Sequence, residues 1–249
     1  MLREVTKSLA RSLGFELRRF APVSSYTAQL RAMLSWHRVD LIFDVGANAG
    51  QFGRELRRQV GFTGRIVSFE PMKAAYERLS AQARKDPQWD VAPRAAIGAQ
   101  EGTVTINVAR NSVSSSVLPM LESHTRAAPE SRYTDAETVR LAALDALTPG
   151  YFGRESIAFL KVDTQGYESE VLKGAPRTLA RVVGVQLELS LIPLYTGQLL
   201  MPELLEFMRD AGFDLWAVTP AFTDPENGRL LQVDAAFFRR VPPSESGVG

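Results

Sequence analysis

The sequence predicts an α/β fold with a doubly wound, mostly parallel seven-stranded sheet that has an antiparallel strand at one edge. Apolar runs alternate with helical patterns from about residue 39 onward, and such alternation builds a parallel sheet with helices on both faces. Two late apolar runs, residues 213–220 and 235–240, have only a loop between them, which favours an antiparallel pair.

Each element follows from its own pattern. Short apolar runs bounded by glycine, proline or polar clusters indicate buried strands. The expected strands are residues 39–46, 64–71, 91–98, 156–163, 182–191, 213–220 and 235–240, with 103–108 as an extra strand. Apolar residues at helical spacing indicate the helices between them. These helices carry Phe52, Leu56 and Val60; Ala75, Leu79 and Ala83, with Pro71 in the first turn; Val171, Leu172, Ala175 and Leu179; and Leu204, Leu205, Met208 and Ala211.

The composition limits the class of protein. The chain has 249 residues, 45% hydrophobic and 23% charged, which suits one globular domain with or without a small appendage. The absence of cysteine excludes disulfides and thiolate metal sites, and two histidines leave little scope for a histidine-rich metal site. A net charge of +1 gives no reason to expect a nucleic-acid partner. No apolar run approaches the roughly 18 residues of a membrane span and no signal peptide is recognisable, so we expect a cytoplasmic protein.

We divide the chain into three parts. Residues 1–35 form a basic helical extension, residues 36–241 the main domain, and residues 242–249 a disordered tail. In the extension, apolar residues recur at near-helical spacing with basic residues on another face. This pattern favours a helix packed by one stripe or, as the alternative, a lid or a peripheral membrane contact. The polar segment 111–138 interrupts the α/β rhythm, and we expect an irregular insertion that forms a mobile wall or lid over a substrate.

The carboxyl ends of the first two strands form a candidate cofactor site, because ligands bind there in doubly wound sheets. The first strand ends in Asp44 before a turn with Gly46 and Gly50, and the second ends in Glu70, placed to accept hydrogen bonds from both hydroxyls of a ribose. A dinucleotide site needs glycine where this chain has Asn48, which disfavours NAD(P), and no P-loop pattern occurs. The D-x-G-x-x-x-G pattern instead suits S-adenosylmethionine (SAM), whose cationic end Asp44 would serve directly or through water.

Five segments resemble, in order, those of one known family: FDVGANAGQF, VSFEP, AAIG with EG after it, LKVDTQGYESEVLKGA and VQLELSLIPLY. They are similar to the FkbM family of methyltransferases, and the resemblance runs from about residue 39 to 240. It implies a class I, Rossmann-like, SAM-dependent O-methyltransferase that acts on a hydroxyl, often on a sugar of a glycolipid, polysaccharide or natural product. The alternatives are a methyltransferase that acts on a non-sugar small molecule, a nicotinamide-dependent oxidoreductase, and a non-catalytic protein of the same fold.

We expect the cofactor to contact the first turn, the ends of the second and third strands, and the loop after the 156–163 strand. The expected contact residues are Asp44, Gly46, Asn48, Gly50, Gln51, Phe52, Glu70, Pro71, Ala96, Asp163 and Gln165. A Gly46→Val change in the turn is expected to block cofactor binding and to leave the fold intact.

Methyl transfer to a hydroxyl needs a group that takes the proton, and carboxylates are the best-supplied candidates here. Asp163 is the first candidate for the base or a metal ligand, because it ends an apolar strand where an idle carboxylate would be costly; the alternative is a helix cap or a loop contact. Glu188 is a second acid of the site, or else the partner of a buried arginine. His124 is another candidate base, or else a surface residue of the insertion.

The chain departs from the family's usual pattern at Gln165, where an acidic residue is common. An amide lacks the charge that metal ligation or base catalysis at this position would use. A divalent metal that lowers the pKa of the acceptor hydroxyl is therefore the less favoured alternative, and we assign no metal ligand.

Overall fold

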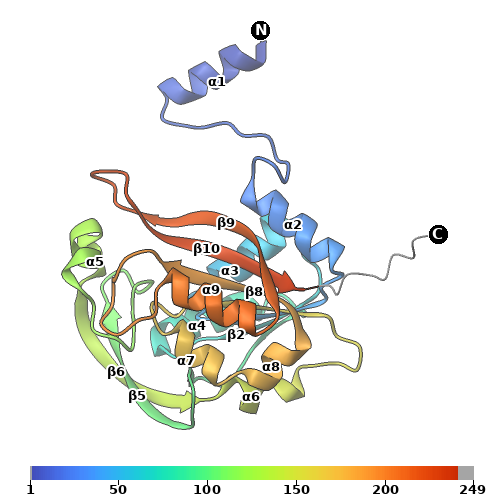
Figure 1. Ribbon diagram of the computed structural model, residues 1–249, viewed down its shortest axis with the longest axis vertical. Helices are drawn as coiled ribbons and strands as arrows, with labels where there is room; N and C mark the ends of the chain where they lie inside the picture. Colours follow the sequence, from blue (N-terminus) through green and yellow to red (C-terminus); the bar gives the residue numbers. More distant parts are fainter. Residues whose placement is uncertain (1, 241–249) are drawn as a thin grey trace.

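The computed structural model describes residues 2–240, and its centre is a seven-stranded sheet (Figure 1). The strands lie in the order β3 (Trp89–Val91), β2 (Arg65–Phe69), β1 (Leu41–Val45), β7 (Ala158–Val162), β8 (Val182–Ser190), β10 (Leu230–Arg239) and β9 (Phe213–Thr223). The first five are parallel, and β10 runs antiparallel to both of its neighbours. The predicted fold class is confirmed, with the reversed strand β10 next to the edge strand β9. The predicted tail, residues 242–249, lies outside the described residues.

Helices cover both faces of this sheet, because the strands are apolar on both sides. The helices on one face are α2 (Tyr26–Trp36), α3 (Gln51–Glu55) with its π-helical continuation (Leu56–Val60), and α4 (Lys73–Ala83). Those on the other are α6 (Leu144–Leu147) with a 3-10 turn (Thr148–Gly150), α7 (Glu168–Lys173), α8 (Pro176–Arg181) and α9 (Met201–Asp210). Adjacent residues of β1 pack into different cores, Ile42 under α2 and α3 and Phe43 on the opposite side.

A second sheet lies beside α4. Its strands are, in order, β4 (Ala96–Ile97), β6 (Tyr133–Ala142) and β5 (Gly102–Ala109), and a small apolar cluster joins it to Ala75 of α4. The prediction of one strand over 91–98 is therefore wrong. The third strand of the main sheet ends at Val91, and Ala96–Ile97 pair with β6 instead.

The segment 111–138 is less irregular than the sequence predicts. It contains α5 (Glu122–Ala127), a 3-10 turn (Pro129–Ser131) and the first part of β6. The sequence pattern misses this part of β6 because it is mostly exposed and has no apolar run.

The helix expected to carry Val171 to Leu179 is two helices, α7 and α8. Pro176 occupies the first turn of α8, where its missing N–H is tolerated. The expectation that Pro71 is in the first turn of the next helix is wrong, because α4 begins at Lys73 with Met72 as its N-cap. The Met72 N–H instead donates a hydrogen bond to the Glu70 carboxylate.

The predicted N-terminal extension has two different parts. Helix α1 (Leu2–Ser12) stands away from the sheet at the end of an extended connection (Figure 1). Helix α2 instead belongs to the domain, because Leu30, Met33 and Leu34 are buried in the core. No helix within residues 2–240 is long and apolar enough to cross a membrane.

Replacement of Phe159 tests the core beneath α2 and α3. Phe159→Ala removes a fully buried ring and leaves a cavity, so the free energy of unfolding is expected to fall by about 3–5 kcal/mol. Urea denaturation measures the change. Trp36→Ala is the control, because this side chain is 75% exposed and its loss should change stability by less than about 0.5 kcal/mol. Equal effects of the two changes would contradict this core.

Candidate functional site

A cavity of about 470 Å³ opens at the carboxyl ends of the central strands. This size suits a small-molecule ligand. Nine of the eleven predicted cofactor residues line it: Gly46, Asn48, Gln51, Phe52, Glu70, Pro71, Ala96, Asp163 and Gln165. Gly50 lies in the turn next to the cavity without lining it, and Asp44 lies behind its wall.

The turn after β1 requires glycine at Gly46. Its φ is +80°, and a Cβ built there would lie 1.8 Å from the backbone oxygen of Asp163. The glycine thus allows the turn to touch the loop after β7. The expectation that Gly46→Val leaves the fold intact is therefore wrong, since any side chain would push β1 and β7 apart.

Glu70 lies at the cavity with both carboxylate oxygens held by the backbone. One oxygen accepts a hydrogen bond from the Asn48 N–H and the other from the Met72 N–H, each at 2.8 Å. Burial raises the pKa of Glu70 to about 7, although both backbone bonds oppose that rise. Each oxygen keeps a further lone pair for a ligand hydroxyl.

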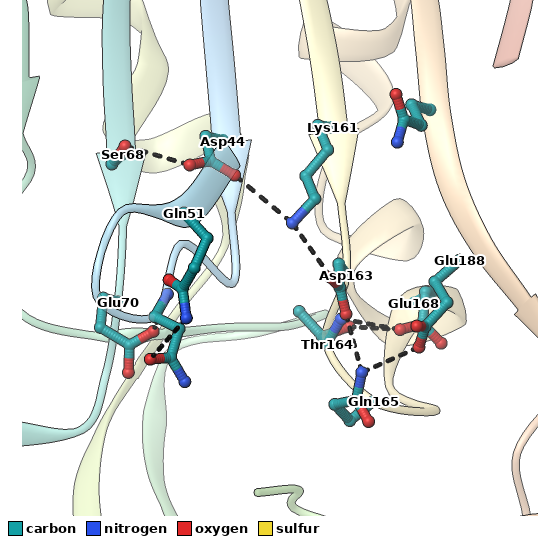
Figure 2. A network of polar contacts seen from close by, with 12 residues as sticks. Asp44, Gln51, Ser68, Glu70, Lys161, Asp163, Thr164, Gln165, Glu168 and Glu188 are labelled. Atoms are coloured by element: carbon teal, nitrogen blue, oxygen red, sulfur yellow. Dashed lines mark hydrogen bonds and ion pairs between the residues drawn. The ribbon is translucent and has the colours of Figure 1, made fainter. Parts of the chain in front are cut away.

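Lys161 of β7 is the buried cation of the site (Figure 2). Its Nζ lies 3.5 Å from Asp44 Oδ1 and 3.2 Å from Asp163 Oδ2, and Ser68 donates to the other Asp44 oxygen at 3.3 Å. Burial alone lowers the pKa of Lys161, but Asp163 and Asp44 raise it above its ordinary value. Burial likewise raises the pKa of Asp44. Asp44 therefore faces Lys161, and not the cavity where a cofactor's cationic end was expected.

Gln165 joins Asp163, which lines the cavity, to Glu188, which does not (Figure 2). Its Nε2 donates to Asp163 Oδ1 and to Glu188 Oε2, both at 2.9 Å, and its Oε1 accepts from the Tyr195 hydroxyl at 2.8 Å. An acid in place of Gln165 would put three carboxylates together without the bridging N–H donor. These contacts explain why the chain has an amide at Gln165, where the family's pattern commonly has an acid.

Glu188 and His124 do not line the cavity. Glu188 accepts hydrogen bonds from Gln165 and Gln232 rather than from an arginine, and burial together with Asp163 raises its pKa. His124 is buried beside the rings of Tyr195 and Phe222, and burial lowers its pKa to about 4. The expectation of a surface histidine is wrong, and its place outside the cavity gives no support to its role as base.

The loop after β7 is fixed by Glu168. Its carboxylate accepts hydrogen bonds from the Thr164 N–H at 2.7 Å, the Thr164 hydroxyl at 3.1 Å and the Gly166 N–H at 3.2 Å. Burial raises the pKa of Glu168 to about 7. Because the loop is held at Thr164, the preceding Asp163 has a defined position.

The sequence pattern misses the other end of the cavity. Its residues are Tyr26 of α2, Glu55 of α3, Gln186 of β8, Thr219 and Pro220 of β9, and Asp234 of β10. Tyr26 donates a hydrogen bond to Gln186 at 2.9 Å, and burial together with Asp163 raises the pKa of Asp234 to about 6. The sequence contains only a weak signal for this end of the cavity. It consists of single polar residues, such as Lys161, within the apolar strands β7, β8 and β10.

The start of the insertion closes one side of the cavity. Its lining residues are Ser112, Val113, Ser115, Ser116 and Val117. The Ser116 hydroxyl donates to the backbone oxygen of Gln165 at 2.7 Å, which ties the insertion to the loop after β7.

No group of three or more histidine or carboxylate side chains within residues 2–240 is arranged to hold a metal ion. The place between Asp44 and Asp163 is taken by the Lys161 ammonium. The donor set therefore does not fit a resident metal.

The strand order and the cavity define the class of protein. A sheet with this order, a glycine turn after β1 and an acid after β2 is the class I SAM-dependent methyltransferase fold. A family model described as the methyltransferase FkbM domain matches residues 44–215, more than half of the chain. The protein belongs to this family of methyltransferases. A search of curated protein sequences found no match.

Several solved structures are similar to this chain. A methyltransferase FkbM from Methylobacillus flagellatus KT is 14% identical with a TM-score of 0.47, and the match covers 80% of this chain and 43% of that one. The chain thus spans less than half the length of that protein. An rRNA methylase from Streptococcus thermophilus is 9% identical (TM-score 0.46; 91% of this chain, 100% of that one). A SAM-dependent methyltransferase from Aquifex aeolicus is 15% identical (TM-score 0.42; 88% and 100%).

Removal of the buried cation tests the charge cluster. Lys161→Met leaves Asp44 buried without its partner, so the free energy of unfolding is expected to fall by about 3–5 kcal/mol. Adding Asp44→Asn should restore part of that loss, because it removes the uncompensated charge. Lys173→Met, at an exposed ion pair, is the control and should cost less than about 1 kcal/mol. A Lys161→Met protein as stable as the wild type in denaturant titrations would show that the pair is unimportant.

Proposed function

We propose that the protein is a SAM-dependent O-methyltransferase that acts on a hydroxyl of a sugar in a glycolipid, polysaccharide or glycosylated natural product. The observation that supports this function most directly is a cavity that joins the glycine turn and Glu70 at one end to a polar wall at the other. Asp163 follows β7, the strand that lies between these two ends of the sheet.

The end next to β1 and β2 fits SAM. The Glu70 carboxylate, held by two backbone N–H groups, would accept the ribose hydroxyls. Met72, Ala96 and Ile97 give an apolar surface for the adenine. When bound, SAM would supply a methyl group attached to a sulfonium, and transfer of that methyl group would leave a neutral thioether. The protein's remaining tasks are to align the acceptor oxygen and to take its proton.

The opposite end suits a polyhydroxylated acceptor. Glu55 and Asp234 offer carboxylate acceptors, while Gln186 and Thr219 each both donate and accept hydrogen bonds. Ser112, Ser115 and Ser116 of the insertion also line the cavity, and Asn48 of the turn after β1 donates to the Ser112 hydroxyl at 3.4 Å. Such a mixture of donors and acceptors matches sugar hydroxyls better than an apolar acceptor.

Asp163 is the proposed general base. It lines the cavity, and its carboxylate is oriented by Lys161 on one oxygen and Gln165 on the other. A sugar hydroxyl is hardly ionised at neutral pH, so a carboxylate placed against it would take the proton as the oxygen attacks. A positioned base of this kind contributes about 10²–10⁴-fold to the rate.

Transfer of an isotopically labelled methyl group tests the function. The protein is incubated with labelled SAM and a glycan or glycolipid extract, and mass spectrometry follows the label. Label on a sugar hydroxyl is expected, unchanged by a chelator, and Asp163→Asn should lower turnover by about 10²–10⁴-fold while SAM still binds. Asp135→Asn, at an exposed carboxylate, is the control. Label found only on nitrogen or carbon acceptors, or full turnover by Asp163→Asn, would refute the respective assignment.

The affinity for SAM should depend on the ionisation of Glu70. Because burial raises its pKa to about 7, the free carboxyl is protonated below that pH, whereas ribose hydroxyls bind the carboxylate. The dissociation constant measured by calorimetry is therefore expected to rise toward about tenfold per pH unit below pH 7. Glu70→Gln should weaken binding by about 1–3 kcal/mol and remove this dependence. The exposed Glu77→Gln should retain it, and the same pH profile in Glu70→Gln would exclude Glu70 as its source.

A further inference from the structure

The segment before α2 presents many apolar side chains to solvent. We call residues 2–25, which comprise α1 and the connection to α2, the N-terminal arm (Figure 1). Among residues 6–25, the large exposed apolar side chains are Leu9 (63%), Leu13 (67%), Phe15 (68%), Leu17 (49%), Phe20 (55%) and Val23 (95%). Six large exposed apolar side chains within residues 9–23 are more than the scattered surface residues of a typical domain, and they indicate an interaction surface.

The arm also carries a net positive charge, whereas the net charge of the rest of the chain is negative. The first 25 residues have five basic and two acidic side chains, for a net charge of +3, so the remaining residues carry −2 within the chain's total of +1. Arg18 pairs with Glu16 at 2.6 Å, and this pair leaves the net excess unchanged. The arm is therefore complementary to an anionic surface.

Both properties begin at α1 and continue into the connection. Leu9 of α1 and Leu13, one residue past its end at Ser12, are four residues apart in the sequence, and Lys7 and Arg11 form a second pair at this spacing. A helix with an apolar face and a basic face lies in the interface of a bilayer, with its apolar side chains at the level of the headgroups. An 11-residue helix is about 16 Å long, too short for the roughly 30 Å hydrocarbon core.

We propose that the N-terminal arm docks on the surface of an anionic phospholipid bilayer. The apolar side chains of residues 9–23 enter the interfacial layer, and Arg11, Arg18 and Arg19 contact headgroup phosphates. The arm leads directly into α2, whose first residue, Tyr26, lines the cavity and donates a hydrogen bond to Gln186. Docking therefore holds the polar end of the cavity near the membrane. This last consequence rests on the proposed function and favours a lipid-linked acceptor; docking itself does not depend on it.

Vesicle co-sedimentation of the full chain tests the docking. The vesicles are phosphatidylcholine alone or phosphatidylcholine with phosphatidylglycerol, and neither SAM nor an acceptor is present. Binding to the anionic vesicles is expected, and much less to the neutral ones. It should weaken as salt shortens the Debye length from about 10 Å at 0.1 M to about 3 Å at 1 M.

Paired variants separate the two contributions. Arg18→Glu with Arg19→Glu should lower partitioning at least about 20-fold, since each basic residue near such a surface contributes about fivefold. Arg126→Glu with Arg209→Glu makes the same change in net charge at exposed positions outside the arm and should have little effect on binding. Phe15→Ser with Phe20→Ser should lower partitioning about tenfold or more, whereas Leu199→Ser, at an exposed leucine before α9, should not.

Three outcomes would overturn the proposal. One is failure of the full chain to bind anionic vesicles. Another is equal loss of binding in the Arg126/Arg209 control, which would indicate a response to net charge alone. The third is a dimer in light scattering that the Phe15/Phe20 variant abolishes, because the arm would then bind a second copy of the chain. Calorimetry with SAM on the same samples shows whether the proposed function fails separately.

Discussion

The ion pairs of Lys161 are the interaction on which the site depends. An ammonium buried among apolar strands is tolerated only with close partners, and here Asp44 of β1 and Asp163 after β7 supply them. The register of β1 and β7 places Asp44 directly beside Lys161. Just beyond these two strands, the lack of a side chain at Gly46 allows the turn after β1 to contact the Asp163 backbone. Charge pairing and close packing therefore fix the turn after β1 relative to the loop after β7.

A chain of hydrogen bonds extends this rigid centre to the insertion. Gln165 ties Asp163 to Glu188 and accepts from Tyr195, while Ser116 donates to the Gln165 backbone. Each carboxylate in this group thus has a donor, as buried charge requires. The residue that the sequence marks as a departure from its family is the link between the loop and the wall of the cavity. An amide performs this bridging role because it donates and accepts at once.

Sequence patterns predict what is local and miss what depends on distant pairing. The central strands, the glycine turn and Glu70 follow from short runs of residues, and the structure places Glu70 and Asp163 at one cavity. Lys161 as the partner of Asp44 depends on strand register, which no local pattern contains. Asp234 and Tyr26 lie more than 200 residues apart in the chain and meet only through the fold. The predictions for the insertion fail for other reasons. The strand β6 is half-solvated, so its polar sequence resembles that of a loop. His124 is buried by aromatic partners that are distant in the sequence.

The two ends of the cavity differ in how freely they can change. The turn, Glu70 and Asp163 are tied to the central strands by backbone contacts and buried charge, so a side chain at Gly46 or loss of the Lys161 ion pairs disturbs the sheet. The other end is assembled from α2, α3, β8 and the last two strands of the sheet, β10 and β9. Glu55, Thr219 and Pro220 of this end are not fully buried and can vary with smaller effects on the central strands, whereas Gln186 is buried beside Lys161 in the register of β7 and β8. Under the proposed function, substitutions at Glu55, Thr219 and Pro220 are therefore expected to alter acceptor binding with less effect on the sheet than a side chain at Gly46.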